Sequence, residues 1–161
     1  MEEKGQIEGP YSINERVTYL EQVVWLRDCK YEDLAVIARF LRVAKYGQGL
    51  VVCAEGERRQ CLSIIGDGKV RVYKKNGADH KELATLNAGK TFGEMSLLDG
   101  YPTSASIVAV NDLFLLELPM RNYEDLVDAH PRVALQLLTA IARMMSARLR
   151  STSGRLAQFL T

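Results

Sequence analysis

The chain has 161 residues, of which 47% are hydrophobic and 25% charged, and its net charge is +1. This length and composition are typical of one globular domain that buries a core without metal or disulfides. No apolar run is long enough to cross a bilayer, and the acidic start Met1–Gly5 is unlike a signal peptide. Three widely spaced cysteines indicate reduced thiols. We therefore expect a cytoplasmic protein that does not enter a membrane.

The charges are distributed unevenly along the chain. All twenty acidic residues precede residue 129, and the segment after it carries five arginines and no acid. A basic segment can bind nucleic acid or acidic lipid. No aromatic residues suited to base stacking alternate with these arginines, so arginines that complement a helix dipole and solvate one helix face explain the pattern better.

Residues 1–11 are expected to be a disordered tail that ends after Gly9-Pro10, and residues 12–45 a helical segment. Ser12 and Glu15 have the spacing of a capping box, which predicts a helix start near residue 12. An apolar stripe through Val17, Leu20 and Val24 follows. A second stripe from Leu34 to Leu41 predicts another helix.

Residues 46–119 change to short β-rich runs separated by glycine turns. Several short strands at this spacing predict a sandwich or barrel rather than a parallel sheet. Asn76-Gly77 between two alternating runs predicts a hairpin. With helices on both sides of about eight strands, the fold class is α+β.

Residues 120–161 return to a helical period, and Pro131 suits the first turn of a long final helix. Apolar residues then recur at alternating spacings of three and four for three heptads, from Leu135 to Leu156. The first half of this stripe is expected to cover the protein's own β unit. The second half is a candidate contact for a protein partner or a second copy, through Leu138, Met145, Leu149 and Leu156, although Gly154 weakens its end.

The segment of residues 89–110 offers the clearest binding chemistry. Phe92-Gly93-Glu94 precedes the helix-compatible run Met95–Leu98. The start of a helix offers free N–H groups to a phosphate, and glycine lets a ligand approach the backbone closely. Glu94 is able to accept hydrogen bonds from a sugar hydroxyl, or alternatively to complement the helix dipole.

This segment resembles the phosphate-binding cassette of the cyclic-nucleotide-binding domains, which occur in cAMP-dependent kinase regulatory subunits, catabolite-activator-type regulators and gated channels. The resemblance covers residues 17–150 and includes Tyr46–Gly49, Glu55–Glu57 and Asp67–Val70. It implies an eight-stranded antiparallel β-roll of jelly-roll type over residues 46–119, a cassette at 92–106, a hinge helix at 120–129 and a lid helix at 131–150.

The resemblance also implies a ligand, cAMP or cGMP, and no tightly bound cofactor. The implied site residues are Phe92, Gly93, Glu94, Met95, Ser96, Thr103 and Ser104. Gly93 and Met95 would donate backbone N–H groups to the cyclic phosphate, Glu94 would bind the ribose 2′-hydroxyl, and Ser104 would add a hydroxyl contact.

The chain departs from the family pattern after Pro102, where Thr103 replaces the arginine that pairs with the phosphate. Arg58, Arg59 and Arg71 are the candidates for a substitute cation from another strand. Three functions remain open: a cyclic-nucleotide receptor, a sensor for a less anionic ligand, and a ligand-free dimerisation or docking module. The intact Phe92-Gly93-Glu94 favours the first.

An enzyme and a transcription factor are the rival classes. His80 and His130 are far apart and adjoin charged or turn residues, so neither a metal oxygenase nor a nucleophilic hydrolase is expected. Cys53 and Cys61 are expected to be small core residues. A helix-turn-helix after the last helix would need further residues, so we expect no DNA-binding domain.

Overall fold

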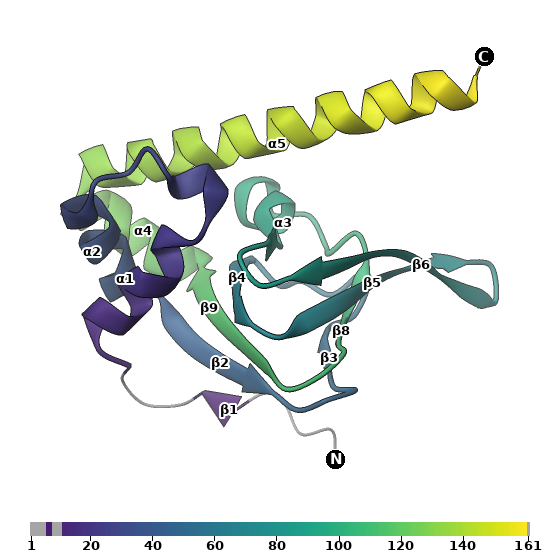
Figure 1. Cartoon of the computed structure of the whole chain (residues 1–161), viewed down its shortest axis with the longest axis horizontal. Coiled ribbons are helices and arrows are strands. Elements are labelled where there is room, and N and C mark those ends of the chain that lie inside the picture. The colour runs from purple at the N-terminus through teal and green to yellow at the C-terminus, as the bar shows by residue number, and fades with distance from the viewer. Residues whose placement is uncertain (1–5, 8–10, 161) are drawn as a thin grey trace.

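The computed structural model describes residues 6–7 and 11–160, which form two antiparallel sheets flanked by helices (Figure 1). Helix α1 (Ile13–Glu21), the 3₁₀ turn η1 (Val24–Leu26) and α2 (Tyr31–Phe40) precede the sheets. Helix α3 (Glu94–Asp99) interrupts the strands, and α4 (Met120–Ala129) and α5 (Pro131–Phe159) follow them. The strands are β1 (Gln6–Ile7), β2 (Arg42–Tyr46), β3 (Val51–Cys53), β4 (Cys61–Asp67), β5 (Lys69–Asn76), β6 (Asp79–Asn87), β7 (Thr91–Phe92), β8 (Ser106–Ala109) and β9 (Leu113–Pro119).

The strands confirm the predicted α+β class and the eight-stranded roll. One sheet has the order β1-β2-β9-β4-β7 and the other the order β3-β8-β5-β6. Strands β2 to β9 make up the roll, and the two-residue β1 extends one edge beside β2. The hairpin at Asn76-Gly77 is confirmed: Asn76 lies opposite Asp79, and Gly77 has a φ of 64°, as a tight turn requires.

Strand β9 lies between two apolar cores. Phe114, Leu116 and Leu118 pack among the helices, whereas Leu113 and Leu115 pack in the interior of the roll. A strand buried on both faces is a nearly continuous apolar run, which explains its sequence. Glu117 is the exception, and its charge is fully buried.

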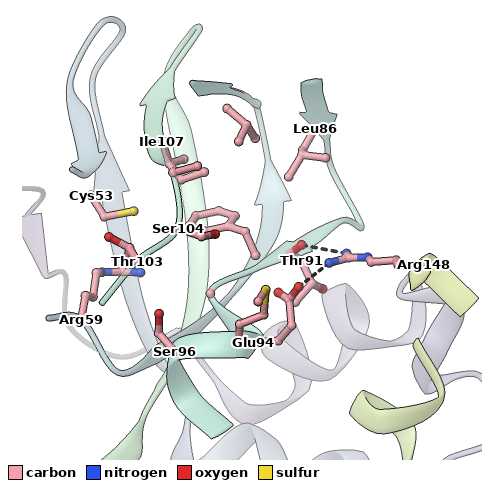
Figure 2. A pocket seen from close by; sticks show the side chains of 15 residues that line it. Cys53, Arg59, Leu86, Thr91, Glu94, Ser96, Thr103, Ser104, Ile107 and Arg148 are labelled. Carbon is pink, nitrogen blue, oxygen red and sulfur yellow. Dashed lines mark hydrogen bonds and ion pairs between the residues drawn. The ribbon is translucent and has the colours of Figure 1, made fainter. Parts of the chain in front are cut away.

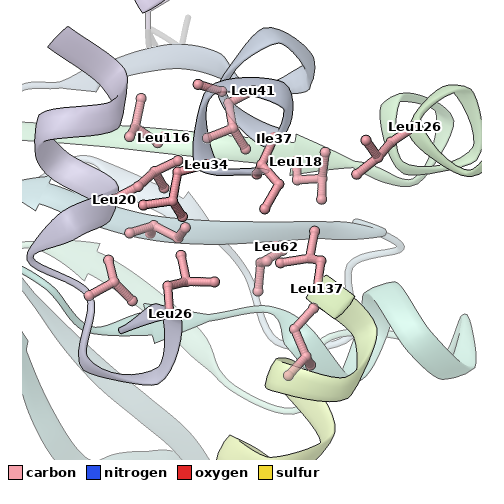
Figure 3. Close-up of a cluster of buried hydrophobic side chains, with 14 of the residues drawn as sticks. Leu20, Leu26, Leu34, Ile37, Leu41, Leu62, Leu116, Leu118, Leu126 and Leu137 are labelled. Carbon is pink, nitrogen blue, oxygen red and sulfur yellow. The ribbon is translucent and has the colours of Figure 1, made fainter. Parts of the chain in front are cut away.

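The larger core fixes the helices on the outer face of the first sheet (Figure 3). Leu20, Ile37, Leu126 and Leu137 contribute from α1, α2, α4 and α5, and each is at most 2% exposed. Burying a leucine or isoleucine side chain stabilises a fold by about 1.5–3 kcal/mol, so this core holds all four helices against the sheet. An ion pair adds to it, because Arg132 of α5 binds the buried Asp33 of α2 at 2.5 Å.

Three details differ from the sequence-based expectations. Strand β2 begins at Arg42, inside the segment expected to be helical up to residue 45. The helix expected to reach Val24 ends at Glu21, and Val24 is exposed. Gln6–Ile7 of the expected disordered tail pair with β2, while the rest of that tail up to residue 10 lies outside the described residues. The capping box of Ser12 and Glu15 is confirmed.

Helix α5 begins at Pro131, as predicted, and has 29 residues. At 1.5 Å per residue it is about 43 Å long. It crosses above α3 in Figure 1, and residues 147–159 of its C-terminal part are exposed. Its buried residues are Val133, Ala134, Leu137, Ile141 and Met144, all in its first half. No described helix is long and apolar enough to span a membrane.

Candidate functional site

The turn between β7 and α3 places the cassette against β4. Gly93 has a φ of 82°, and a Cβ at this position would lie 2.2 Å from the carbonyl oxygen of Cys61. An alanine would therefore clash with the backbone of β4 as well as adopt a strained φ. Phe92 anchors the turn in the interior of the roll, and Glu94 follows as the first residue of α3.

A pocket of about 200 Å³ opens beside this turn (Figure 2). All seven site residues predicted from the sequence line it: Phe92, Gly93, Glu94, Met95, Ser96, Thr103 and Ser104. The sequence did not place the other lining residues here. Thr91, Ala105 and Ile107 adjoin the predicted residues, and five others come from further segments: Cys53, Arg59, Val72, Leu86 and Arg148. The apolar members of this set give the pocket a wall suited to a flat, uncharged group.

Glu94 is 8% exposed and has one satisfied and one unsatisfied oxygen. Its Oε1 accepts a hydrogen bond from Nη1 of Arg148 at 2.7 Å. Its Oε2 is buried and has no hydrogen-bond partner among the described residues. Buried carboxylate oxygens are normally hydrogen-bonded, so an orphaned one that lines a pocket marks a place for a donor.

Arg148 attaches α5 to the cassette. Besides Glu94, it donates from Nη2 to the backbone oxygen of Thr91 at 2.9 Å. The side-chain hydroxyl of Thr91 accepts from the indole N–H of Trp25 at 2.9 Å, so η1 also contacts this point. The sequence contained a signal for the direction of Arg148, because the buried positions 134, 137, 141 and 144 continue to 148 at helical spacing.

Thr103, at the position where the resemblance implies an arginine, uses its hydrogen-bonding groups within the chain. Its hydroxyl donates to the backbone oxygen of Ala54 at 2.6 Å. Its backbone N–H donates to Glu57, and its backbone oxygen accepts from Gly56. These contacts fix Thr103 against the turn after β3, so its role in the structure is to hold the loop that closes the pocket.

Of the three candidates for a substitute cation, Arg59 is the one that lines the pocket. Its side chain is 11% exposed and contacts the buried Glu117, and its Nη1 donates to Ser63 Oγ at 3.1 Å. Burial lowers the pKa of Arg59, but the surrounding acidic groups, Glu117 foremost, together hold that pKa above its usual value. Of the other two candidates, Arg58 is exposed, and Arg71 lies in a different depression and pairs with Glu82.

The cysteine in the pocket is not an activated nucleophile. Burial raises the pKa of Cys53 to about 11, so its thiol stays protonated at neutral pH. His80 lies on β6 and His130 between α4 and α5, and neither lines the pocket. No group of three or more metal-ligating side chains is present among the described residues.

The chain is similar to known proteins in both sequence and fold. The model of the cyclic nucleotide-binding domain family matches residues 43–130. The cyclic AMP receptor protein of Thermus thermophilus is 36% identical over 115 residues, which are 71% of this chain and 53% of that protein. Glutaminase 1 of Bradyrhizobium diazoefficiens is 28% identical over 141 residues, 88% of this chain and 22% of that enzyme. A solved cyclic nucleotide-binding domain from Methylobacillus flagellatus has the same fold, with a TM-score of 0.79 and 23% identity over 91% of this chain and 83% of that one.

The family match covers more than half of the chain and runs from β2 to the end of α4. It includes both sheets of the roll and every residue of the pocket except Arg148. The chain spans about half the length of the Thermus protein and less than a quarter of the glutaminase. The chain belongs to the cyclic nucleotide-binding domain family.

Proposed function

We propose that this chain is a regulatory module that binds a cyclic nucleotide, cAMP or cGMP, in the pocket beside the β7–α3 turn, and that it catalyses no reaction. The observation that carries the proposal is the buried Oε2 of Glu94, which has no hydrogen-bond partner within residues 6–7 and 11–160. A ribose 2′-hydroxyl is a donor of the right kind for this oxygen, and binding there removes the cost of leaving a buried acceptor unsatisfied.

The rest of the pocket suits the other parts of a nucleotide. Val72, Leu86 and Ile107 offer apolar contact to a base. The backbone at Gly93 and Met95 begins α3, where N–H groups have no partner within the helix, so a cyclic phosphate finds donors there. Arg59 adds a positive charge.

The size of the pocket connects binding to α5. Pockets that hold small-molecule ligands measure roughly 300–1,000 Å³. At about 200 Å³ this pocket is smaller, so a nucleotide has to displace part of its rim. Arg148 is the part of the rim carried by α5, and its contacts to Glu94 and Thr91 are the attachments that a ligand would disturb. Movement of α5 is then the signal.

Calorimetric titration with cAMP and cGMP tests the proposal. We expect saturable binding to the unmodified chain. In Glu94→Ala the loss of a charged hydrogen-bond acceptor should weaken binding by roughly 1.5–3 kcal/mol, or about 10- to 150-fold. Asp99→Ala is the matched control, because Asp99 is an exposed acid on the same short helix that does not line the pocket. No binding of either nucleotide by the unmodified chain would contradict the proposal.

A second function, self-association through α5, is favoured by a separate observation. The stripe formed by Leu135, Leu138, Ala142, Met145, Leu149, Thr152 and Leu156 lies beside the face that covers the protein's own core, and within the stripe Met145 packs against that core. That face lies one residue earlier, at Ala134, Leu137, Ile141 and Met144. The first half of α5 therefore covers the protein's own core, as expected, but through this face and not through the stripe, whose Leu135 is 64% exposed. In the second half, Leu149 and Leu156 are 68% and 58% exposed.

The charges of α5 favour a second copy in parallel as the partner. With the stripe at positions a and d of a heptad, Arg148 and Arg155 fall at g positions. Their opposite e positions in a parallel pair are Ser153 and Leu160, so no like charges meet across the contact.

A further inference from the structure

The described charged groups in and directly behind the pocket add up to one net positive charge. Among the described residues that line the pocket, three are charged at neutral pH: Arg59, Glu94 and Arg148. Glu94 pairs with Arg148, which leaves Arg59. Behind the pocket, the buried Glu117 pairs with Arg59 and also with a second arginine, Arg42, at 2.9 Å. These two arginines and one glutamate again sum to one positive charge. The Arg42 side chain is 41% exposed and the Arg59 side chain 11%. The arginine at the pocket, Arg59, is therefore the more buried of the two cations.

Arg59 stands at the point where the family's cassette arginine is absent. The backbone N–H groups of Arg59 and Thr103 both donate to the carbonyl oxygen of Glu57, at 3.1 and 2.9 Å. Figure 2 shows both side chains at one end of the pocket, with Glu94 and Arg148 at the other. The Thr103 hydroxyl already donates to Ala54. Arg59 has five N–H donors, more than its contacts to Ser63 and Glu117 use.

We propose that Arg59 supplies the cation for the ligand's phosphate, and that the pocket consequently selects ligands with a single negative charge, such as a phosphodiester. This inference rests on the proposed nucleotide site and specifies the charge of its ligand. A phosphodiester neutralises the excess charge. A phosphate monoester carries a charge of about −1.5 to −2 at pH 7 and would introduce an unbalanced negative charge into a buried site. A nucleoside would leave this net positive charge without a counter-charge.

The test is calorimetry on the full chain with three ligands that share one base: cAMP, 5′-AMP and adenosine. We expect cAMP to bind more tightly than both others. Arg59→Met should weaken cAMP binding at least about 30-fold, as expected when one member of a buried charge pair is removed. The same substitution should leave adenosine binding unchanged, and retained adenosine binding shows that the variant is folded. Arg58→Met, which removes a neighbouring but exposed arginine, should change neither affinity.

A transplant of the charge provides the second arm. Thr103→Arg in the Arg59→Met background returns a cation to the same end of the pocket and should restore most of the cAMP affinity without changing that of adenosine. Arg59→Lys, which keeps the charge and loses the planar fork, should fall between the unmodified chain and Arg59→Met.

The outcomes separate this inference from the function on which it rests. If the unmodified chain binds adenosine as tightly as cAMP, or if Arg59→Met weakens both equally, the role of Arg59 is overturned while the nucleotide site stands. Tighter binding of 5′-AMP than of cAMP overturns the single-charge selection. If the chain binds none of the three, the proposed function and this inference both fail.

Discussion

Gly93 has a specific structural reason to be glycine. Its φ of 82° costs any other residue roughly 1–3 kcal/mol. A side chain here would also meet the Cys61 carbonyl oxygen 2.2 Å away, which is backbone and cannot move aside cheaply. Gly56 has nearly the same φ of 83°, yet a Cβ there has no neighbour within 4 Å. The two glycines therefore separate the conformational penalty from the steric one.

We expect Gly93→Ala to lower the free energy of unfolding by more than Gly56→Ala does, with a difference of about 1–3 kcal/mol from overpacking. Urea denaturation of both variants and the unmodified chain measures this difference. Equal losses in the two variants would mean that β7 moves away from β4 without cost. In that case the close approach of the cassette to β4 would not be a constraint.

The residues of the site were predictable to different degrees for a physical reason. Phe92 to Ser96 are contiguous, so a local motif identifies them. Arg59 was only a candidate cation, but an alternating pattern is consistent with its direction, because Ile65 packs inside the roll and Ser63, two residues earlier, accepts a hydrogen bond from Arg59. Arg148 lies 54 residues from Glu94, and which group it meets depends on how α5 crosses the roll. No local sequence pattern specifies the angle at which α5 crosses the roll.

At the scale of elements, the predicted helices and hairpin were recovered because each has a local signal. Strand β2 was missed because it begins directly after α2 with a single residue between, so the helical period of α2 masks it. Strand β7 has two residues, too few for any period to show. For α5 the length and the apolar repeat were evident, but the face that the protein itself uses was assigned one residue too far along the helix.

The exposed stripe of α5 leads to a prediction for this element. We expect the chain to form a dimer in solution, and Leu149→Lys with Leu156→Lys to raise its dissociation constant at least about 100-fold, because each copy loses two leucines worth roughly 1.5–3 kcal/mol when buried. Light scattering over a range of concentrations measures the change. Val24→Lys serves as the control, since Val24 is 70% exposed and lies on η1. A chain that is monomeric at every concentration would rule out self-association.

At the scale of the whole molecule, the two cores meet along the strands of the first sheet, and the interior of the roll contains two thiols. Burial is the main cause that raises the pKa of Cys53 and of Cys61 from 9.0 to about 11. Glu117 adds to the shift of Cys61, and Arg59 opposes it. Between pH 9 and 11 the folded chain therefore keeps two protons that the unfolded chain releases. Their contribution to stability is complete below pH 9 and is lost as the pH rises toward 11.

This linkage predicts an alkaline loss of stability that belongs to the interior of the roll. The free energy of unfolding should fall between pH 9 and 11 by roughly 2 kcal/mol for each of the two thiols, because one pKa unit corresponds to about 1.4 kcal/mol. Cys53→Ala with Cys61→Ala should lower stability at pH 7 through lost packing and remove most of this slope. Cys29→Ala is the control: burial also raises the pKa of half-buried Cys29, but less than in the roll, so this variant should remove a smaller part of the slope. Urea denaturation at several pH values measures all three proteins, and an unchanged slope in the double variant would mean that the folded roll lets these thiols ionise.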